Sequence, residues 1–91
     1  MKTFRQSSQF KKDLKRIQNN PKKREKLKIV LTLLRNTGTV PPEYKPHMLV
    51  GQYKGYMECH IEGDFLLIWI DESENVIKLA RLGSHSELFK S

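Results

Sequence analysis

The sequence contains a single cysteine, Cys59, and no run of apolar residues long enough to cross a membrane. One cysteine cannot form a disulfide within the chain, which is typical of a protein in a reducing compartment. A membrane-spanning helix needs about 20 consecutive apolar residues, so no membrane partner is expected. The first residues, MKTFRQSSQF, lack the apolar core of a signal peptide. We therefore predict a cytoplasmic protein.

Sequence motifs for cofactors are also absent. The chain has no glycine-rich phosphate loop and no dinucleotide-binding fingerprint. A zinc site would need ligands from His47, Cys59, His60 and His85, but the chain has no Cys-x2-Cys pair and no His-x3–5-His pair. Adjacent Cys59 and His60 would also point to opposite faces of a strand. The sequence therefore predicts no metal site and no cofactor.

Acidic residues are scarce in the first part of the chain and common in the rest. Residues 1–36 hold 12 lysine and arginine residues against two acidic ones, a net charge of +10. Residues 37–91 hold five against eight, a net charge of −3. A basic half joined to a mildly acidic half indicates a nucleic acid or an acidic protein as partner. The alternative is a lysine-rich surface that only keeps the helices soluble.

The basic part of the sequence has the spacing of two helices. Ser7 or Ser8 is suited to begin the first as its N-cap, and apolar residues recur at helical spacing as Phe10, Leu14 and Ile17. A second helix is predicted over residues 21–36, where one apolar face contains Leu27, Val30, Leu31 and Leu34. Two short amphipathic helices joined by a tight link form a hairpin that must cover an apolar surface.

The last third of the chain has the pattern of a sheet. Residues 55–62 alternate, with Met57, Cys59 and Ile61 on one side and Tyr56, Glu58 and His60 on the other. Residues 65–70 are nearly all apolar, as in a strand buried on both faces, and residues 76–82 alternate with Ile77, Leu79 and Arg81 on one side. Short strands are also predicted over residues 1–5 and 48–50. These patterns predict one α+β domain over residues 1–91, with an antiparallel sheet of four to five strands, the order β-α-α-β-β-β and the helical hairpin on one face.

Three histidines lie beside the ends of these elements. His47 follows a proline-rich loop, His60 lies on the polar side of a strand, and His85 follows the last strand. Each alone is typical of an ordinary surface histidine, but imidazole titrates near neutral pH, so two histidines can share acid and base catalysis.

RNA cleavage without a metal needs groups of this kind. A base takes the proton of the ribose 2′-OH, a cation stabilises the phosphate, and an acid protonates the leaving 5′ oxygen. Asp64 could orient a histidine, and Arg81 ends a strand close to His85 in sequence. Tyr56, Phe65 or Phe89 could stack on an unpaired base, although core packing is an equal alternative for both phenylalanines. Cys59 is not expected to be a nucleophile, because it shares its side of the strand with Met57 and Ile61.

Several motifs resemble the YafQ branch of the RelE superfamily, which are toxins of toxin–antitoxin pairs. They are YKPHML at residues 44–49, KGY at 54–56, CHI at 59–61 with Asp64 after it, and LGSHSELF at 82–89. The likeness covers nearly the whole chain, and the combined H…H-x3-D…GSH-x3-F pattern is specific where no single piece would be.

The resemblance implies a microbial ribonuclease-like fold and cleavage of mRNA, usually on the ribosome, by attack of the 2′-OH. It implies that His47, His60, Asp64 and His85 are active-site residues, that Arg81 contacts the phosphate and that Phe89 is the C-terminal aromatic of the site. We expect the substrate-contacting residues to be Lys54, Tyr56, Phe65 and Phe89. We expect His85 to be the general acid, His60 or Asp64 the base, and His47 with Arg81 the phosphate contacts. Some relatives have tryptophan in place of Phe65, which weakens the stacking role there.

The resemblance also implies protein partners. A cognate antitoxin would cover the basic surface, often with a partly disordered acidic segment, and block the site. The toxin–antitoxin complex would bind promoter DNA through the antitoxin. The alternative function, from a different class, is a non-catalytic module on the same fold that binds gyrase or RNA. Such modules typically lack the histidine set.

Overall fold

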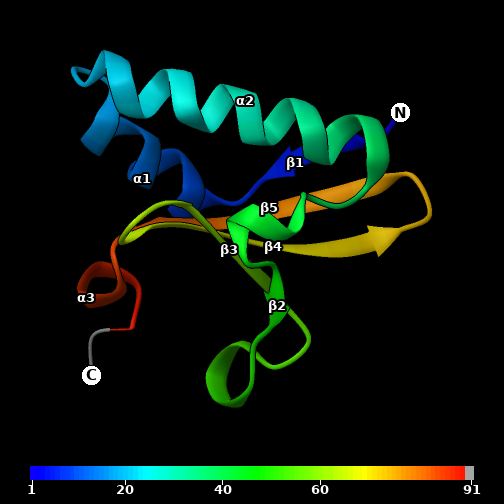
Figure 1. Cartoon of the computed structure of the whole chain (residues 1–91). Helices are drawn as coiled ribbons and strands as arrows, with labels where there is room; N and C mark the ends of the chain where they lie inside the picture. The colour runs from blue at the N-terminus through cyan, green and yellow to red at the C-terminus, as the bar shows by residue number, and fades with distance from the viewer. Residues whose placement is uncertain (90–91) are drawn as a thin grey trace.

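The computed structural model describes residues 1–89, which form helices packed against one five-stranded sheet with the order β1-β5-β4-β3-β2 (Figure 1). The elements are β1 (Thr3–Gln6), α1 (Ser8–Ile17), α2 (Pro21–Thr37), β2 (His47–Met48), β3 (Met57–Glu62), β4 (Phe65–Ser73), β5 (Val76–Gly83) and α3 (His85–Leu88). The predicted antiparallel pairing holds from β2 to β5, but β1 pairs with β5 in parallel. The alternation of so short a strand carries no signal of its direction.

The helical hairpin begins and ends where its capping residues predict. The Ser7 side chain accepts a hydrogen bond from the backbone N–H of Phe10 at 2.9 Å and donates one to the carbonyl of Ala80 at 2.8 Å, so the start of α1 is tied to β5. Asn20 caps α2, and Gly38 ends it with a φ of 81°. Among residues 1–89, no helix has the length and apolar character needed to span a bilayer.

Apolar side chains pack on both faces of the sheet, in a large cluster on one face and a small cluster on the other. The main core lies between the hairpin and the sheet and includes Phe10, Val30, Leu34, Leu67 and Trp69. A smaller cluster on the opposite face is formed by Leu66, Ile68, Ala80 and Leu88. Strand β4 contributes to both clusters, which confirms the prediction from its continuous apolar run. The hairpin lies above the sheet in Figure 1, with β2 and α3 below it.

A bulge in β5 overturns the predicted alternation of that strand. Ile68 pairs with Arg81 and Trp69 pairs with Leu79, so Ala80 is an extra residue between the two pairs. Because cross-strand partners share a face, Arg81 lies on the side of Ile68 and the smaller cluster. The prediction that Arg81 shares the side of Ile77 and Leu79 is therefore wrong. The bulge moves Arg81 toward the face that carries the histidines.

Candidate active site

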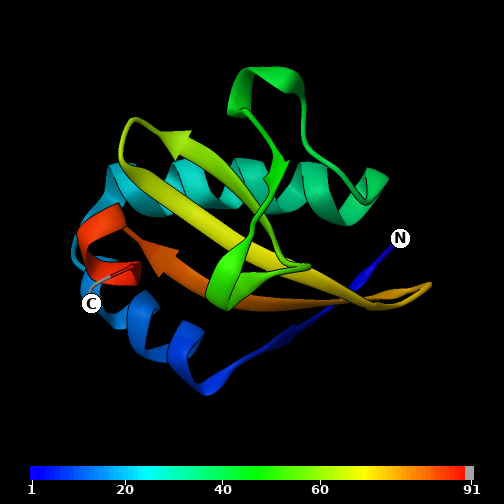
Figure 2. The ribbon, with the colours of Figure 1, turned by 90° about the horizontal axis from the view of Figure 1, so that it is seen from below.

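Three histidines from separate elements lie side by side on the sheet face opposite the hairpin, which we call the histidine face. His47 comes from β2, His60 from β3 and His85 from the start of α3. The ring centroids of His47 and His60 are 6.2 Å apart, and those of His60 and His85 are 5.9 Å apart. Figure 2 looks onto this face from below. The structure thus brings together histidines that lie in three separate motifs of the sequence.

Asp64, in the turn between β3 and β4, holds His85 in place. Its Oδ1 atom accepts hydrogen bonds from the backbone N–H of His85 at 2.9 Å and from the ring Nδ1 at 2.7 Å. Both bonds lower the pKa of Asp64, the backbone bond more than the ring bond. Asp64 is therefore a carboxylate near neutral pH. Since Nδ1 carries a hydrogen here, Nε2 is the ring atom available to a substrate. The carboxylate fixes the tautomer and the orientation of the ring, which suits His85 to transfer a proton at Nε2.

The turn between β5 and α3 fixes the start of α3 and thereby the position of His85. Ser84 and Glu87 form a capping box, in which the Glu87 carboxylate accepts from the Ser84 backbone N–H at 2.8 Å. Gly83 has a φ of 152°, and a Cβ atom there would lie 2.7 Å from Oε1 of Glu87. The positive φ favours glycine at this position, so the Gly-Ser-His order of the sequence has a structural cause.

His60 is held in the same way, but by an uncharged acceptor. Its Nδ1 lies 3.0 Å from the carbonyl oxygen of Gly63. A carbonyl only accepts, so Nδ1 carries the hydrogen and the neutral ring has a lone pair on Nε2. This tautomer suits His60 to take up a proton. A recess of about 450 Å³ opens beside the ring, and Lys26, Tyr44 and Lys45 are among the residues that line it.

His47 differs from both, because each of its ring nitrogens faces an acceptor. Nδ1 lies 2.9 Å from the carbonyl oxygen of Lys45, and Nε2 lies 3.0 Å from Oε1 of Glu58. Glu58 is buried, and its other oxygen, Oε2, has no hydrogen-bond partner within residues 1–89. A proton must lie between Nε2 and Glu58 for this contact to be favourable. With both ring nitrogens held by acceptors, His47 is placed to contact a phosphate and not to transfer protons.

Aromatic rings extend the site beyond His85. The Phe89 ring is 5.8 Å from that of His85 and 5.7 Å from that of Tyr53, and Tyr53 is 5.7 Å from Tyr56. The Phe89 side chain remains partly exposed, while Tyr53 and Tyr56 pack on the smaller cluster. Lys54 is exposed in the loop between the two tyrosines. The base-stacking role of Phe89 and the substrate contacts of Lys54 and Tyr56 stay predictions, with Phe89 the ring nearest to His85.

Arg81 is placed differently from the prediction of an open phosphate-binding cation. Its Nε and Nη2 atoms donate to the two carboxylate oxygens of Asp13 at 2.9 and 3.3 Å, and Nη1 lies 3.4 Å from the hydroxyl of Tyr53. The hydrogen bonds to Asp13 are the main cause that raises the pKa of Arg81. The same carboxylate accepts from the backbone N–H of Leu82 at 2.9 Å. In this structure Arg81 joins α1 to β5 and supports Tyr53.

Two further expectations are decided by burial. Phe65 is 4% exposed and packs in the main core on the hairpin side, with Nζ of Lys23 5.1 Å from its ring centroid. A base-stacking role for Phe65 is therefore wrong, because the ring lies on the other face of the sheet from the histidines. Cys59 is buried, and burial raises the pKa of its thiol to about 12, as expected for a packing residue.

Three residues that hold the site side chains in place were not predicted from the sequence. They are Glu58, Tyr53 and Asp13. Glu58 could have been found, because it shares the polar side of its strand with His60. Asp13 was visible as the one carboxylate in a basic helix. Tyr53 gave no signal of its contact with Arg81, which depends on how a loop folds over the sheet.

Comparisons with known proteins agree over nearly the whole chain. The family model "Bacterial toxin of type II toxin-antitoxin system, YafQ" matches residues 2–90. The mRNA interferase toxin YafQ of Escherichia coli K12 is 40% identical over 84 residues, which are 91% of this chain and 90% of that protein.

Solved structures agree with the fold. A chain of the E. coli DinJ-YafQ toxin-antitoxin complex matches with a TM-score of 0.83 at 38% identity, covering 97% of both chains. A metal-bound toxin from Helicobacter pylori matches with a TM-score of 0.84 at 41% identity, covering 98% of this chain and 100% of that chain. In residues 1–89 of the present chain, no group of three or more histidine, cysteine, aspartate and glutamate residues could hold a metal ion. The predicted RelE-like α+β fold is confirmed.

Proposed function

This chain belongs to the YafQ family of bacterial type II toxins, and we propose that it cleaves mRNA with the imidazoles on its histidine face. The toxin is an endoribonuclease, as is its 40% identical relative that bears the name mRNA interferase. One observation carries the assignment to this face: the rings of His60 and His85 lie 5.9 Å apart, and each has its Nδ1 fixed by an acceptor. Two Nε2 atoms are thereby available to one phosphodiester.

The reaction divides between these two rings. Nε2 of neutral His60 takes the proton of the ribose 2′-OH, and the 2′ oxygen attacks the neighbouring phosphorus. The bond from phosphorus to the 5′ oxygen breaks, and Nε2 of protonated His85 gives that oxygen its proton. The products are a 2′,3′-cyclic phosphate and a 5′-hydroxyl, and no step requires a metal ion. Asp64 acts on His85, whose backbone N–H and ring Nδ1 both donate to its Oδ1, and we assign the base to His60.

His47 supplies the positive charge at the phosphate. Arg81 is held by Asp13, whereas the His47 side chain is about half exposed at 47%. We assign the proton of the His47–Glu58 contact to Nε2, so that His47 faces the site as a cation balanced by Glu58 beneath it. Phe89, beside His85, is placed to stack on an unpaired base.

Membership of the family also supports an assignment of the molecules that this toxin binds. A cognate antitoxin is the protein partner, in line with the solved DinJ-YafQ complex of a relative. We place the cleavage on mRNA held by the ribosome, in the cytoplasm, and we place promoter DNA in contact with the antitoxin and not with this chain. The assignments to the antitoxin, the ribosome and promoter DNA are inferred from membership of the family, and each can be tested directly.

The substitution His85→Ala tests the catalytic assignment. Loss of the general acid is expected to slow mRNA cleavage by about 10²–10⁴-fold, while thermal unfolding stays unchanged because the ring is exposed. Ser86→Ala, at the next exposed position of α3, is the matched control and keeps full activity. Fragments recovered after brief expression should end in 2′,3′-cyclic phosphates. Undiminished cleavage by folded His85→Ala protein contradicts the assignment, and intact transcripts with the unaltered chain favour a non-catalytic module.

A further inference from the structure

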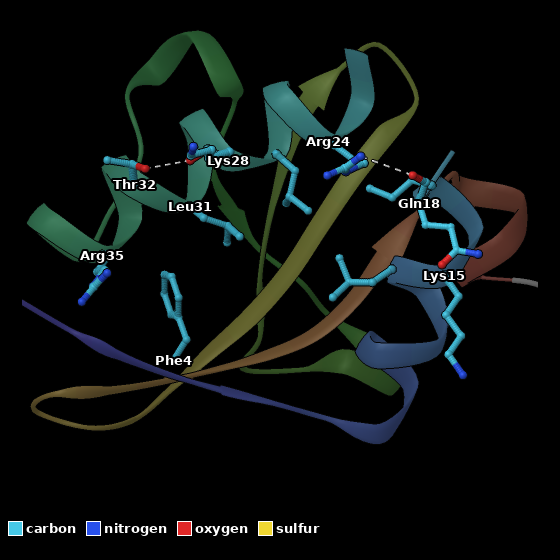
Figure 3. Close-up of a pocket in the computed structure, with 11 residues that line it drawn as sticks. Phe4, Lys15, Gln18, Arg24, Lys28, Leu31, Thr32 and Arg35 are labelled. Carbon is cyan, nitrogen blue, oxygen red and sulfur yellow. Dashed lines mark hydrogen bonds between the residues drawn. The ribbon is translucent and has the colours of Figure 1, made fainter. Parts of the chain in front are cut away.

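Two hollows in the described part of the chain differ in their relation to the histidines. The larger, of about 710 Å³, lies between α1, α2 and β1, where Phe4 rises toward Leu31 (Figure 3). No histidine is among the residues that line it. The smaller is the recess of about 450 Å³ beside His60, which we call the His60 recess. Of the two, the His60 recess is the one that adjoins the groups proposed to cleave RNA.

The His60 recess is present because β2 is shorter than β3. Strand β2 pairs with Met57 and Glu58 of β3, and the pairing ends before His60. Beyond that point the edge of β3 is flanked by α2 and by the 3₁₀ turn Pro42–Tyr44, and both contribute to the lining. Figure 2 shows that turn, in green, beyond the β3 edge of the sheet. The recess therefore opens at the sheet edge, next to the histidine face.

The lining of the recess suits the base of a nucleotide. Tyr44 provides an aromatic ring, and Ile29 and Ile61 provide apolar surface. Ile29 is 47% exposed, so this part of the wall is accessible from solvent. The volume of about 450 Å³ lies in the usual range of ligand sites, which is about 300–1,000 Å³. Proteins that bind single-stranded RNA hold unpaired bases by stacking them on aromatic side chains of this kind.

The charged residues of the recess favour a base inside it over a phosphate. Lys26 forms an ion pair with Glu62 at 3.4 Å, and Glu43 adds a second carboxylate to the lining. Carboxylates repel a phosphate but accept hydrogen bonds from the exocyclic amino group of a base. Lys45 forms no salt bridge within residues 1–89. Its carbonyl oxygen lies 2.9 Å from Nδ1 of His47, so Lys45 connects the recess to the proposed phosphate contact.

We propose that the His60 recess holds the base of the nucleotide on the 5′ side of the cleaved bond. This inference rests on the function proposed above, in which His60 takes the proton of that nucleotide's 2′-OH. The 3′-side nucleotide, whose 5′ oxygen receives a proton from His85, then lies toward Phe89. The rings of His60, His85 and Phe89 follow one another at 5.9 and 5.8 Å. This order gives the bound RNA one direction across the histidine face.

Two isomeric nucleotides test this direction. Adenosine 3′-monophosphate mimics the 5′-side nucleotide, and adenosine 5′-monophosphate mimics the 3′-side nucleotide with the same composition. In ¹⁵N spectra of the full chain, the 3′ isomer should shift the backbone amides of Ile29, Tyr44 and Ile61. The 5′ isomer should instead shift the amides of Tyr53 and Phe89. Identical shifts from both isomers, the opposite assignment, or no shift at the recess with either isomer would each overturn the proposal.

Ile29→Glu tests the recess itself by adding a negative charge to its exposed wall. Asn36→Glu, at an exposed position of α2 that does not line the recess, is the control with the same change of charge. Ile29→Glu should weaken binding of the 3′ isomer and slow mRNA cleavage, each by about tenfold, and leave binding of the 5′ isomer unchanged. Asn36→Glu should alter none of the three.

The recess assignment and the proposed function can fail separately. Full cleavage of mRNA by Ile29→Glu, or equal weakening of both isomers, would overturn the recess assignment and leave the histidine chemistry in place. An unaltered chain that binds the 3′ isomer in the recess but cleaves no mRNA would instead overturn the proposed function, with the recess still a nucleotide site.

Discussion

Two aspartate pairs in this protein have similar chemistry and opposite surroundings. Asp64 binds His85 at 2.7 Å on the surface, where the two side chains are 61% and 55% exposed. Asp13 binds Arg81 at 2.9 Å in the interior, where the exposed fractions are 1% and 12%. In both pairs the carboxylate also accepts a backbone N–H, from His85 in the first and from Leu82 in the second. Each pair joins segments that lie far apart in the sequence.

The difference in exposure divides the two pairs between chemistry and stability. An exposed ion pair contributes about 0–1 kcal/mol to folding, because water screens it. Breaking a buried pair on one side leaves an uncompensated charge in the interior and costs about 3–5 kcal/mol. Asp64 can therefore orient His85 while contributing little to the stability of the fold, whereas Asp13 fixes α1 on β5. Sequence motifs that place an aspartate near a basic residue do not distinguish these cases.

The largest expected effect is on stability, from Asp13→Ala. This change leaves Arg81 without its carboxylate and Leu82 without an acceptor, so the free energy of unfolding should fall by about 3–5 kcal/mol. Urea unfolding followed by tryptophan fluorescence measures the loss, since Trp69 is buried in the core. The double variant Asp13→Leu/Arg81→Met should recover much of it by removing both charges. A loss below about 1 kcal/mol for Asp13→Ala would place this pair with exposed ones.

Asp64→Asn should show the reverse pattern. The amide oxygen can still accept both bonds from His85, but the negative charge that favours the protonated ring is gone. We expect mRNA cleavage to fall by about ten- to a hundredfold, less than for removal of the acid itself. The free energy of unfolding should not change measurably, because the pair is exposed to water. Asp71→Asn, an exposed aspartate in β4 without a salt bridge in the described chain, serves as the control and should alter neither quantity. Unfolding of Asp64→Asn with activity retained would reverse the contrast drawn between the two pairs.

Much of the fold was predictable because its signals are local. The helical spacing of Phe10, Leu14 and Ile17 and the capping by Ser7 depend on neighbouring residues alone, as does the apolar run of β4. The parallel pairing of β1 with β5 was not predicted, because strand direction is set by a partner some 70 residues away.

The site was predictable in its residue types but not in its connections. Motifs identified the three histidines and Asp64, yet the bulge at Ala80 decided the face of Arg81, and burial decided that Phe65 is a core residue. Glu58 acquires its role only when β2 pairs with β3 and sets His47 opposite it in register. Such contacts depend on strand register, which a single sequence specifies weakly where one partner is only two residues long.

Glu58→Gln sharpens the comparison with a third carboxylate, which is buried like Asp13 but bonded to a histidine like Asp64. An amide cannot balance an imidazolium, so His47 should lose its charge and cleavage should fall by about tenfold. Stability should change little, because the amide leaves one buried polar atom without a partner as the carboxylate does, and its oxygen can still accept from His47.

The ¹⁵N spectrum of His47 at neutral pH supplies a readout that a purely structural role would not move. It should show two protonated ring nitrogens in the unaltered chain and one in the variant. Glu62→Gln, exposed on the same strand, should leave both the spectrum and the activity unchanged. A His47 ring that is already neutral in the unaltered chain would remove the role assigned to Glu58.

The smallest expected effect is a local pH dependence at α3. The hydrogen bonds from His85 lower the pKa of Asp64 below its ordinary value of 3.8, so the link contributes its full stabilisation above that value and loses it as the pH falls through the lower, folded-state pKa. Selective ¹³C labelling of the aspartate carboxyls should therefore show Asp64 titrating below 3.8, with the amide proton of His85 shifting in the same window. In Asp64→Asn the amide should not shift there. Glu87, whose pKa is also lowered within α3, is resolved separately because glutamates carry no label. If Asp64 instead titrates at 3.8 or above, its carboxylate is not held by His85 in solution, and the exposed pair loses the role that separates it from the buried one.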